Sequence, residues 1–287
     1  MFALPIIGLL AGSAAVAAAE GPIYVVPPAQ ISFTFSADFT PKVLSKRQLT
    51  GTSMRVRTKV STEDGSQPPA LRELVLELDK NLAIEAKGLP VCHPRPQEDK
   101  DMQSAGMDCP DALVGVGQAE FEIAFPEQSP FTVRSEVHAF NAGVANGKTQ
   151  LLLHAYLGAP VSAAVVIPGE VHRTSKGRFG LQVIAKVPKV AGGYGSLTSF
   201  SLRLGRKFTY KGKKQSYLLA KCPDGHLQAK GVGIFSDGTR LSGTAVRTCI
   251  PKDARLASRA DRSGRWAPAG LGPRLRAGAR RDGASAG

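Results

Sequence analysis

The sequence predicts an all-β protein, an antiparallel β-sandwich with one short helix. Three observations support this fold class. Apolar and polar residues alternate along many short segments, turn dipeptides separate these segments, and no helices are interleaved between them. After a leader and a C-terminal tail are removed, about 220 residues remain, which is enough for one large β domain or two small ones.

The chain opens with a short apolar stretch that becomes rich in alanine up to Ala19. This pattern is typical of a secretory signal, and cleavage after Ala17 or Ala19 fits it, although the first cation is Lys42. A permanent anchor is the alternative, but spanning a bilayer takes about 20 apolar residues. We therefore expect a signal peptide at 1–19, a linker at 20–30, no transmembrane span after cleavage, and a secreted or cell-surface protein.

Period-two alternation predicts the strands of a folded domain over residues 31–250. The alternating residues are Ile31, Phe33, Phe35, Ala37 and Phe39; Met54, Val56 and Val60; Leu74, Leu76 and Leu78; Ala119, Phe121, Ile123 and Phe125; Phe179, Leu181, Val183, Ala185 and Val187; Phe200, Leu202 and Leu204; and Leu227, Ala229, Gly231, Gly233 and Phe235. Two further runs, 151–153 and 163–167, are continuously apolar, which is typical of central strands or strands buried on both faces. The two halves of the domain show a similar order of strands and cysteines. The domain could therefore consist of two related β units.

Three dipeptides predict hairpin turns that pair neighbouring strands in antiparallel fashion. Asn146-Gly147 and Asp237-Gly238 accept positive φ in two-residue turns, and Lys211-Gly212 marks a third, basic tip. The single helix is expected between Pro96 and Ser104, where acidic residues suit a helix N-terminus.

Four cysteines in a chain with an export leader indicate two disulfides, and four cysteines allow three connectivities. We favour the two local pairs, Cys92 with Cys109 and Cys222 with Cys249. No C-x-x-C motif occurs, so we expect no metal site, and the even count leaves no spare catalytic thiol.

Two stretches carry a family resemblance. The first runs from Leu78-Asp79-Lys80-Asn81 through Lys87-Gly88-Leu89-Pro90-Val91-Cys92 to Cys109 and Ala112-Leu113-Val114-Gly115-Val116-Gly117. The second runs from Gly195-Ser196-Leu197-Thr198-Ser199-Phe200 through Ser216-Tyr217, Cys222-Pro223 and Asp237-Gly238-Thr239 to Arg247-Thr248-Cys249. Across residues 30 to 250 the chain resembles an uncharacterised family of exported, cysteine-paired, β-rich proteins of high-GC bacteria. The resemblance implies a secreted β-sandwich and no assigned activity.

Catalytic and cofactor motifs are missing from the sequence. It contains no G-x-S-x-G, H-E-x-x-H, P-loop or G-x-G-x-x-G motif, so we expect neither an enzyme nor a cofactor. The alternative is a secreted hydrolase that uses His138 or His154 with a carboxylate. A two-residue turn at Asn146-Gly147 would place these histidines on opposite faces, and a register shifted by one residue would set them side by side.

Basic residues suggest contact with an anionic partner. Lys207, Lys211, Lys213 and Lys214 surround one predicted hairpin and are candidates for polyanion binding, although such lysines also protect sheet edges. The segment 251–287 is expected to be a disordered basic tail, with or without a selected partner. From Lys252 onward it has nine Lys or Arg and three Asp, a net charge of +6, which leaves about +8 of the total +14 for the rest of the chain.

These features predict a non-catalytic exported protein that binds an anionic cell-wall polymer or a membrane surface, with no specific nucleic-acid partner. Five acidic residues in the first cysteine loop could bind a cation, but a solvated, charged loop is the favoured interpretation. The five residues of this acidic set are Glu98, Asp99, Asp101, Asp108 and Asp111.

Overall fold

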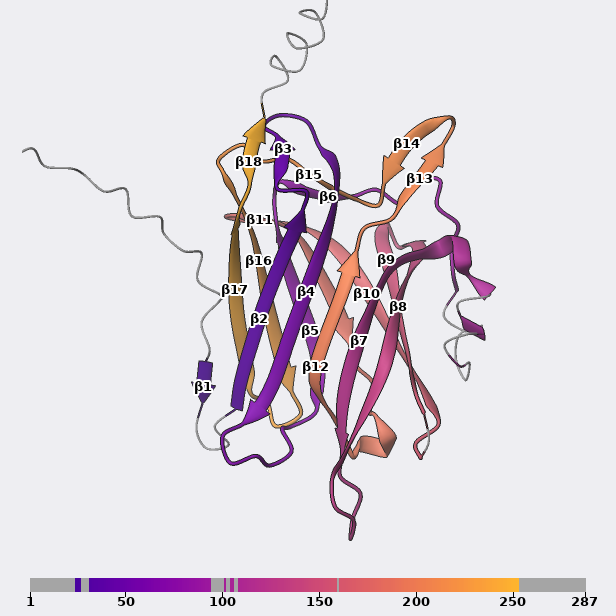
Figure 1. Ribbon diagram of the computed structural model, residues 1–287, viewed down its shortest axis with the longest axis vertical. Helices are drawn as coiled ribbons and strands as arrows, with labels where there is room; N and C mark the ends of the chain where they lie inside the picture. The colour runs from indigo at the N-terminus through magenta and orange to yellow at the C-terminus, as the bar shows by residue number, and fades with distance from the viewer. Residues whose placement is uncertain are drawn as a thin grey trace, which may run out of the picture. The chain divides into compact units, whose positions relative to one another are not determined.

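The computed structural model describes residues 24–26, 31–93, 101, 104–105, 108–158 and 160–252 (Figure 1). Residues 24–26 are described by their backbone alone. The chain divides into two units, 1–252 and 253–287, and all described residues belong to the first. The predicted signal peptide at 1–19 lies outside the described residues, as does the predicted tail at 251–287 except for Pro251 and Lys252, which belong to a strand. Within them the predicted all-β class is confirmed, and almost all strand pairs are antiparallel.

The described elements are eighteen strands and two short 3-10 helices. They are β1 (Tyr24–Val26), β2 (Ile31–Thr40), β3 (Val43–Ser45), β4 (Thr50–Thr62), β5 (Leu71–Asp79), β6 (Leu82–Ile84), the 3-10 helix Pro110–Ala112, β7 (Leu113–Ile123), β8 (Phe131–Ala145), β9 (Lys148–Leu157), β10 (Ala163–Lys176), β11 (Phe179–Lys186), the 3-10 helix Ala191–Gly193, β12 (Gly195–Leu204), β13 (Lys207–Tyr210), β14 (Lys213–Ser216), β15 (Leu218–Ala220), β16 (His226–Phe235), β17 (Arg240–Thr248) and β18 (Ile250–Lys252).

A predicted sandwich of two separate sheets is not confirmed, because the main strands form one hydrogen-bonded sheet of fourteen strands. Its order is β1-β2-β4-β12-β7-β8-β9-β10-β11-β5-β16-β17, with β15 joining β4 to β6. The sheet curls so that β2, β4 and β12 face β5, β11 and β16 across the core (Figure 1). The two far ends meet where Arg247 of β17 donates from Nε to Oδ1 of Asp38 of β2 at 3.0 Å.

Strand β2 shows how the alternating pattern builds this core. Phe33, Phe35 and Phe39 are buried on its inner face, while the residues between them are partly exposed. A Cβ atom at Gly231 of β16 would lie 2.3 Å from the ring of Phe35. Glycine therefore allows β16 to approach β2 closely enough to close the core.

The helix expected between Pro96 and Ser104 falls mostly outside the described residues. No helix of seven or more residues occurs among the described residues, and 94–100 and 102–103, most of the predicted span, lie outside them. Ser104, Ala105 and Asp108 are helical, and the 3-10 helix Pro110–Ala112 directly follows Cys109.

Both predicted disulfides are confirmed. Cys92 bonds to Cys109 and packs with Phe140 and Leu152 in a small apolar cluster on the outer face of β8 and β9. The Cys222–Cys249 disulfide belongs instead to the main core. Disulfides are typical of proteins that fold in oxidising compartments.

The hairpin turns follow the prediction in position but not always in register. Lys211-Gly212 and Asn146-Gly147 have positive φ and close two-residue turns. At Asp237-Gly238 the loop has three residues, because the N–H of Phe235 donates to the carbonyl of Thr239 at 2.9 Å. The register of β16 against β17 is therefore one residue away from the two-residue expectation.

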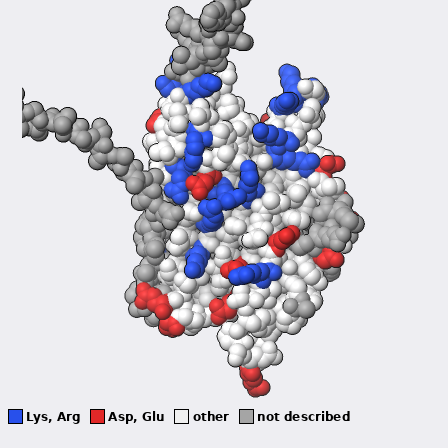
Figure 2. All heavy atoms as spheres, viewed as in Figure 1, with Lys and Arg blue, Asp and Glu red and all other residues white. Residues whose placement is uncertain are grey.

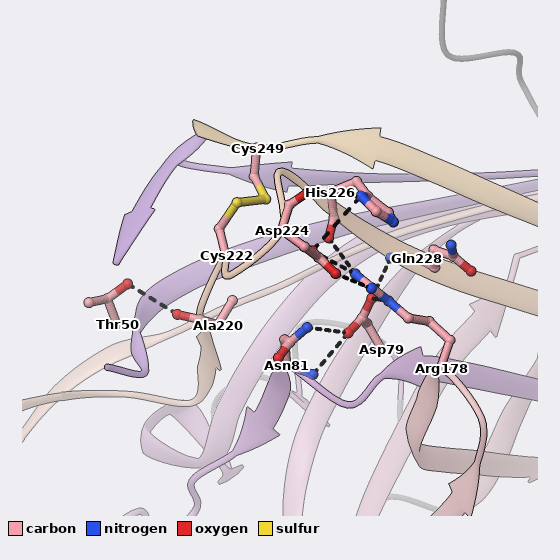
Figure 3. Close-up of a disulfide and its surroundings, with 10 residues drawn as sticks. All are labelled: Thr50, Asp79, Asn81, Arg178, Ala220, Cys222, Asp224, His226, Gln228 and Cys249. Carbon is pink, nitrogen blue, oxygen red and sulfur yellow. Dashed lines mark hydrogen bonds and ion pairs between the residues drawn. A yellow bond between two sulfur atoms is a disulfide. The ribbon is translucent and has the colours of Figure 1, made fainter. Parts of the chain in front are cut away.

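A buried ion network lies beside the second disulfide (Figure 3). Asp79 at the end of β5 is fully buried, and its Oδ2 accepts from Nε of Arg178 at 2.6 Å and from the N–H of Gln228 at 3.0 Å. Its Oδ1 accepts from the backbone and the side chain of Asn81, both at 2.9 Å. Arg178 also forms a two-pronged ion pair with Asp224. The network ties β5, the turn before β11 and the turn before β16 together.

Stability should depend on pH through Asp224. Its hydrogen bonds to Arg178 lower the pKa of Asp224 from 3.8 to about 2. The folded state thus favours the ionised form, and the resulting stabilisation is present above about pH 4 and lost as the pH falls from 4 to 2. The side chain is 41% exposed, so screening reduces the effect to about 1 kcal/mol. Urea unfolding of wild type and Asp224→Asn should show the difference shrinking over that interval. An unchanged difference at pH 6 and pH 2.5 would contradict the assignment.

Candidate functional site

A hollow of about 580 Å³ lies on the outer face of β4, β12, β7 and β8. We call it the basic hollow; its polar lining is Arg55, Arg57, Gln118, Glu136, His138, Ser201 and Arg203. Figure 2 shows Lys and Arg gathered over β4 and β12, in a band that continues toward the β13–β14 hairpin. The three arginines oppose a single carboxylate within the hollow.

Strand register brings these residues together from distant parts of the sequence. Arg55 of β4 stands directly opposite Arg203 of β12, which stands opposite Val116 of β7, which in turn stands opposite His138 of β8. Directly opposed side chains in an antiparallel sheet have Cβ atoms about 4.5–5.5 Å apart. The next row follows the same strands and is Arg57, Ser201, Gln118 and Glu136.

The charges of the hollow are unevenly compensated. Nη1 of Arg57 donates to Oδ2 of Asp38 at 3.4 Å, and Asp38 also pairs with Arg247. Arg55 and Arg203 form no ion pair with any described carboxylate, and both are exposed. Like charges directly opposed on a sheet destabilise it. An anion placed between these two guanidinium groups would relieve that repulsion.

Close packing of the strands forms the floor of the hollow. A Cβ atom at Gly117 would lie 2.0 Å from the backbone oxygen of Ser201. Only glycine allows β7 to approach β12 this closely, and the flanking side chains of Gln118 and Arg203 line the hollow above this contact. The short glycine cluster at 115–117 is thus a packing feature within the candidate site.

His138 lines one end of the hollow, and the register of β8 against β9 corrects the prediction for a two-residue turn. His138 stands directly opposite His154, because a bulge between Asn141 and Val144 shifts the strands by one residue. At the bulge, Gly143 has φ 79° and donates from its N–H to Oδ1 of Asn141 at 3.2 Å. The side-by-side alternative is therefore the correct one.

The two histidines differ in environment. His154 is fully buried, whereas His138 keeps 18% of its side chain exposed and places Nε2 4.0 Å from Oε2 of Glu136. Burial lowers the pKa of His138, and the Glu136 carboxylate opposes this shift only in part. His138 is therefore neutral at pH 7, so it offers hydrogen bonding rather than charge to a ligand.

The four predicted hairpin lysines are exposed on or beside β13 and β14. Lys213 stands opposite Tyr210, and Nζ of Lys211 lies 5.6 Å from the centre of the Tyr210 ring. A Cβ atom at Gly88 would lie 2.2 Å from that ring, so Tyr210 packs against the backbone of residue 88. Lys207, Lys211, Lys213 and Lys214 are thus held on an anchored hairpin rather than on a loose loop.

The remaining sequence candidates do not assemble into a site. Of the acidic set, Glu98 and Asp99 lie outside the described residues, and Asp111 pairs with Arg206 at 3.3 Å. Elsewhere, Nε2 of His172 lies 3.0 Å from Glu170, and His226 lies beside Asp224. Within the described part of the chain, no group of three or more His, Cys, Asp or Glu could hold a metal ion.

Sequence reasoning did not identify Arg55 and Arg57 as site residues. The only local signal was that Arg55, Arg57 and Lys59 alternate with buried residues, which places all three on one face of β4. The partner Arg203 lies far along the chain, so the hollow depends on the register of β4 against β12.

The chain matches no family model, no curated protein and no solved structure. In the described part of the chain, no helix has the length and apolar character needed to span a membrane.

Proposed function

We propose that this chain is an exported, non-catalytic β-sandwich-like protein that binds an anionic cell-surface polymer through the basic hollow. The β13–β14 hairpin adds charge along the same band. Export is supported by the leader pattern and by two disulfides in a chain without a free cysteine among its described residues.

One observation carries the proposal: Arg55 and Arg203 are directly opposed and exposed, and neither forms an ion pair with a described residue. Asp38 of β2 stands opposite Arg55 on the other side, but its carboxylate pairs with Arg57 and Arg247. A guanidinium group offers a fixed fork of donors that matches the oxygens of phosphate, sulfate or carboxylate groups. Arg57, Gln118 and Ser201 line the same hollow and supply further donors. The site is an open hollow on the outer face of the strands, which suits a polymer more than a small enclosed ligand.

A secreted hydrolase is the second candidate, because His138, Glu136 and Ser201 share the hollow. It is less well supported, since 4.0 Å between His138 and Glu136 is longer than a hydrogen bond. In addition, Nδ1 of His138 is buried without a hydrogen-bond partner among the described residues, so no group fixes the orientation of the ring. Ester hydrolysis that disappears in His138→Gln would establish this alternative.

Retention on immobilised dextran sulfate tests the polymer proposal. Wild type should be retained at low salt and released by about 0.5 M salt, where the Debye length falls to about 4 Å. Arg55→Gln with Arg203→Gln should elute at clearly lower salt. Arg72→Gln with Arg173→Gln is the matched control, because it removes two exposed arginines from β5 and β10 and should elute nearly like wild type.

A third variant separates the hollow from the hairpin. Glutamine at Lys211, Lys213 and Lys214 should lower the eluting salt by a smaller step if the hairpin only extends the site. Equal elution of the Arg55/Arg203 and Arg72/Arg173 variants would contradict a specific role of the basic hollow and leave net charge as the cause.

A further inference from the structure

A second hollow adjoins the basic hollow on the outer face of β7 and β8. It has a volume of about 340 Å³ and is lined by Gln118, Ala119, Glu120, Arg134, Ser135 and Glu136. Gln118 and Glu136 line both hollows, so the two form one trough across the face. We call the second one the acidic hollow, because its lining holds two glutamates and a single cation.

Opposite charges lie at the two sides of this trough. Strand β4 carries Arg55, Arg57 and Lys59 on its outer side, and all three are exposed. Strand β7 carries Glu120, and β8 carries Glu136. Figure 2 shows Asp and Glu over β7 and β8, next to the Lys and Arg over β4 and β12. The face is therefore dipolar rather than uniformly basic.

The two glutamates of the acidic hollow differ in how far their charge is compensated. Oε1 of Glu120 accepts from Nε of Arg134 at 2.6 Å, so this carboxylate already has a cation. The side chain of Glu136 is 71% exposed and forms no ion pair with a described Lys or Arg. The imidazole of His138 lies 4.0 Å away, but burial lowers the pKa of His138, so it supplies no cation. Glu136 thus keeps an uncompensated negative charge where the two hollows meet.

The sheet holds the unpaired charges of opposite sign apart. Arg203 of β12 and Glu136 of β8 have β7 between them, and a strand spacing of about 4.8 Å places their strands about 10 Å apart. In the adjacent row, Ser201 and Gln118 stand between Arg57 and Glu136 and offer uncharged donors and acceptors. A wholly anionic ligand is repelled by Glu136, whereas an ammonium group is attracted to it.

We propose that the trough binds an anionic glycan that also carries free amino groups, with an anionic group at Arg55 and Arg203 and an ammonium group at Glu136. This inference rests on the proposed function and narrows its ligand from any polyanion to a zwitterionic polymer. The hydroxyl of Ser201 and the amide of Gln118 match the sugar hydroxyls between the two charges.

Two glycans that differ only in their amino groups test this inference. Hyaluronan carries a carboxylate in each repeating unit, and partial removal of its N-acetyl groups adds ammonium groups without changing the carboxylates. At low salt and about pH 6, where free amines are protonated, wild type should bind deacetylated fragments more tightly than acetylated fragments of equal length. The positive net charge of the protein alone favours the opposite order.

Glu136→Gln removes the charge that is expected to cause this preference. The ratio of affinity for deacetylated over acetylated fragments should fall about two- to fivefold, the range for one exposed ion pair. Glu63→Gln is the matched control and should leave the ratio unchanged, because Glu63 is exposed, follows β4 and lines neither hollow. Arg55→Gln with Arg203→Gln should weaken binding to both forms.

A wild-type preference for the acetylated form, or the same ratio in the Glu136 and Glu63 variants, would overturn the inference. Weaker dextran sulfate retention by the Arg55→Gln, Arg203→Gln variant would still support the proposed function in that case. The two failures are therefore distinguishable.

Discussion

Replacing Arg178 with methionine is expected to lower the free energy of unfolding by about 3–5 kcal/mol, the usual cost of breaking a buried ion pair on one side. The carboxylate of Asp79 is fully buried, and Arg178 is its only ion-pair partner among the described residues. Three N–H groups from Asn81 and Gln228 would still bind Asp79, but none would neutralise its charge.

Urea unfolding of matched variants measures this effect. Arg173→Met is the control, because Arg173 is exposed and forms no ion pair with a described residue. Adding Asp79→Asn to Arg178→Met should recover part of the loss, since the uncompensated charge is then removed. A loss below about 1 kcal/mol for Arg178→Met would show that the network is not a major source of stability.

The second large effect is expected at the Cys222–Cys249 disulfide. On the chain-entropy model, closing a loop over a sequence separation of 27 residues stabilises the fold by about 3–4 kcal/mol. The bond also belongs to the main core, so Cys222→Ala with Cys249→Ala should lose packing as well. Thermal or urea unfolding of the double variant under oxidising conditions measures the loss.

Removing the other disulfide provides the comparison. Closing the Cys92–Cys109 loop, with a sequence separation of 17 residues, stabilises the fold by about 3 kcal/mol on the same model. This disulfide packs in a small separate cluster. Cys92→Ala with Cys109→Ala should therefore be the milder change. A greater loss from the Cys92–Cys109 bond than from the Cys222–Cys249 bond would contradict the roles inferred from their packing.

The strands were predictable because burial on one face of a sheet imposes period two on the sequence. Phe33, Phe35 and Phe39 show it clearly, and all three are buried in β2. The local disulfide pairs were predictable because two cysteines that are close in the sequence are easily brought together. A helix in the first cysteine loop was suggested only by acidic residues, and that signal equally fits a solvated loop.

Registers were harder to predict, because one inserted residue moves every later pair. Asn146-Gly147 forms the expected two-residue turn, yet a bulge three residues earlier places His138 opposite His154. The sequence signal for this bulge was Gly143, which adopts positive φ. A glycine within a strand can have several structural roles, so it does not by itself predict a bulge.

The basic hollow depends on pairing between strands that are distant in the sequence. Arg203 precedes the basic hairpin in the sequence, but neither it nor Arg55 and Arg57 was predicted as a site residue. Only the order β4-β12-β7-β8 brings them to His138 and Gln118. Alternation within one strand shows which of its residues share a face, but not which strands lie beside it in the sheet.

The salt dependence of affinity for soluble dextran sulfate tests the central claim most directly. Each ionic contact with a polyanion contributes about one unit to the slope of log affinity against log salt concentration, by analogy with nucleic-acid binding. Arg55→Gln with Arg203→Gln should reduce the slope by about two, and Arg72→Gln with Arg173→Gln should leave it nearly unchanged. Equal slopes for the two double variants would contradict anion binding in the basic hollow.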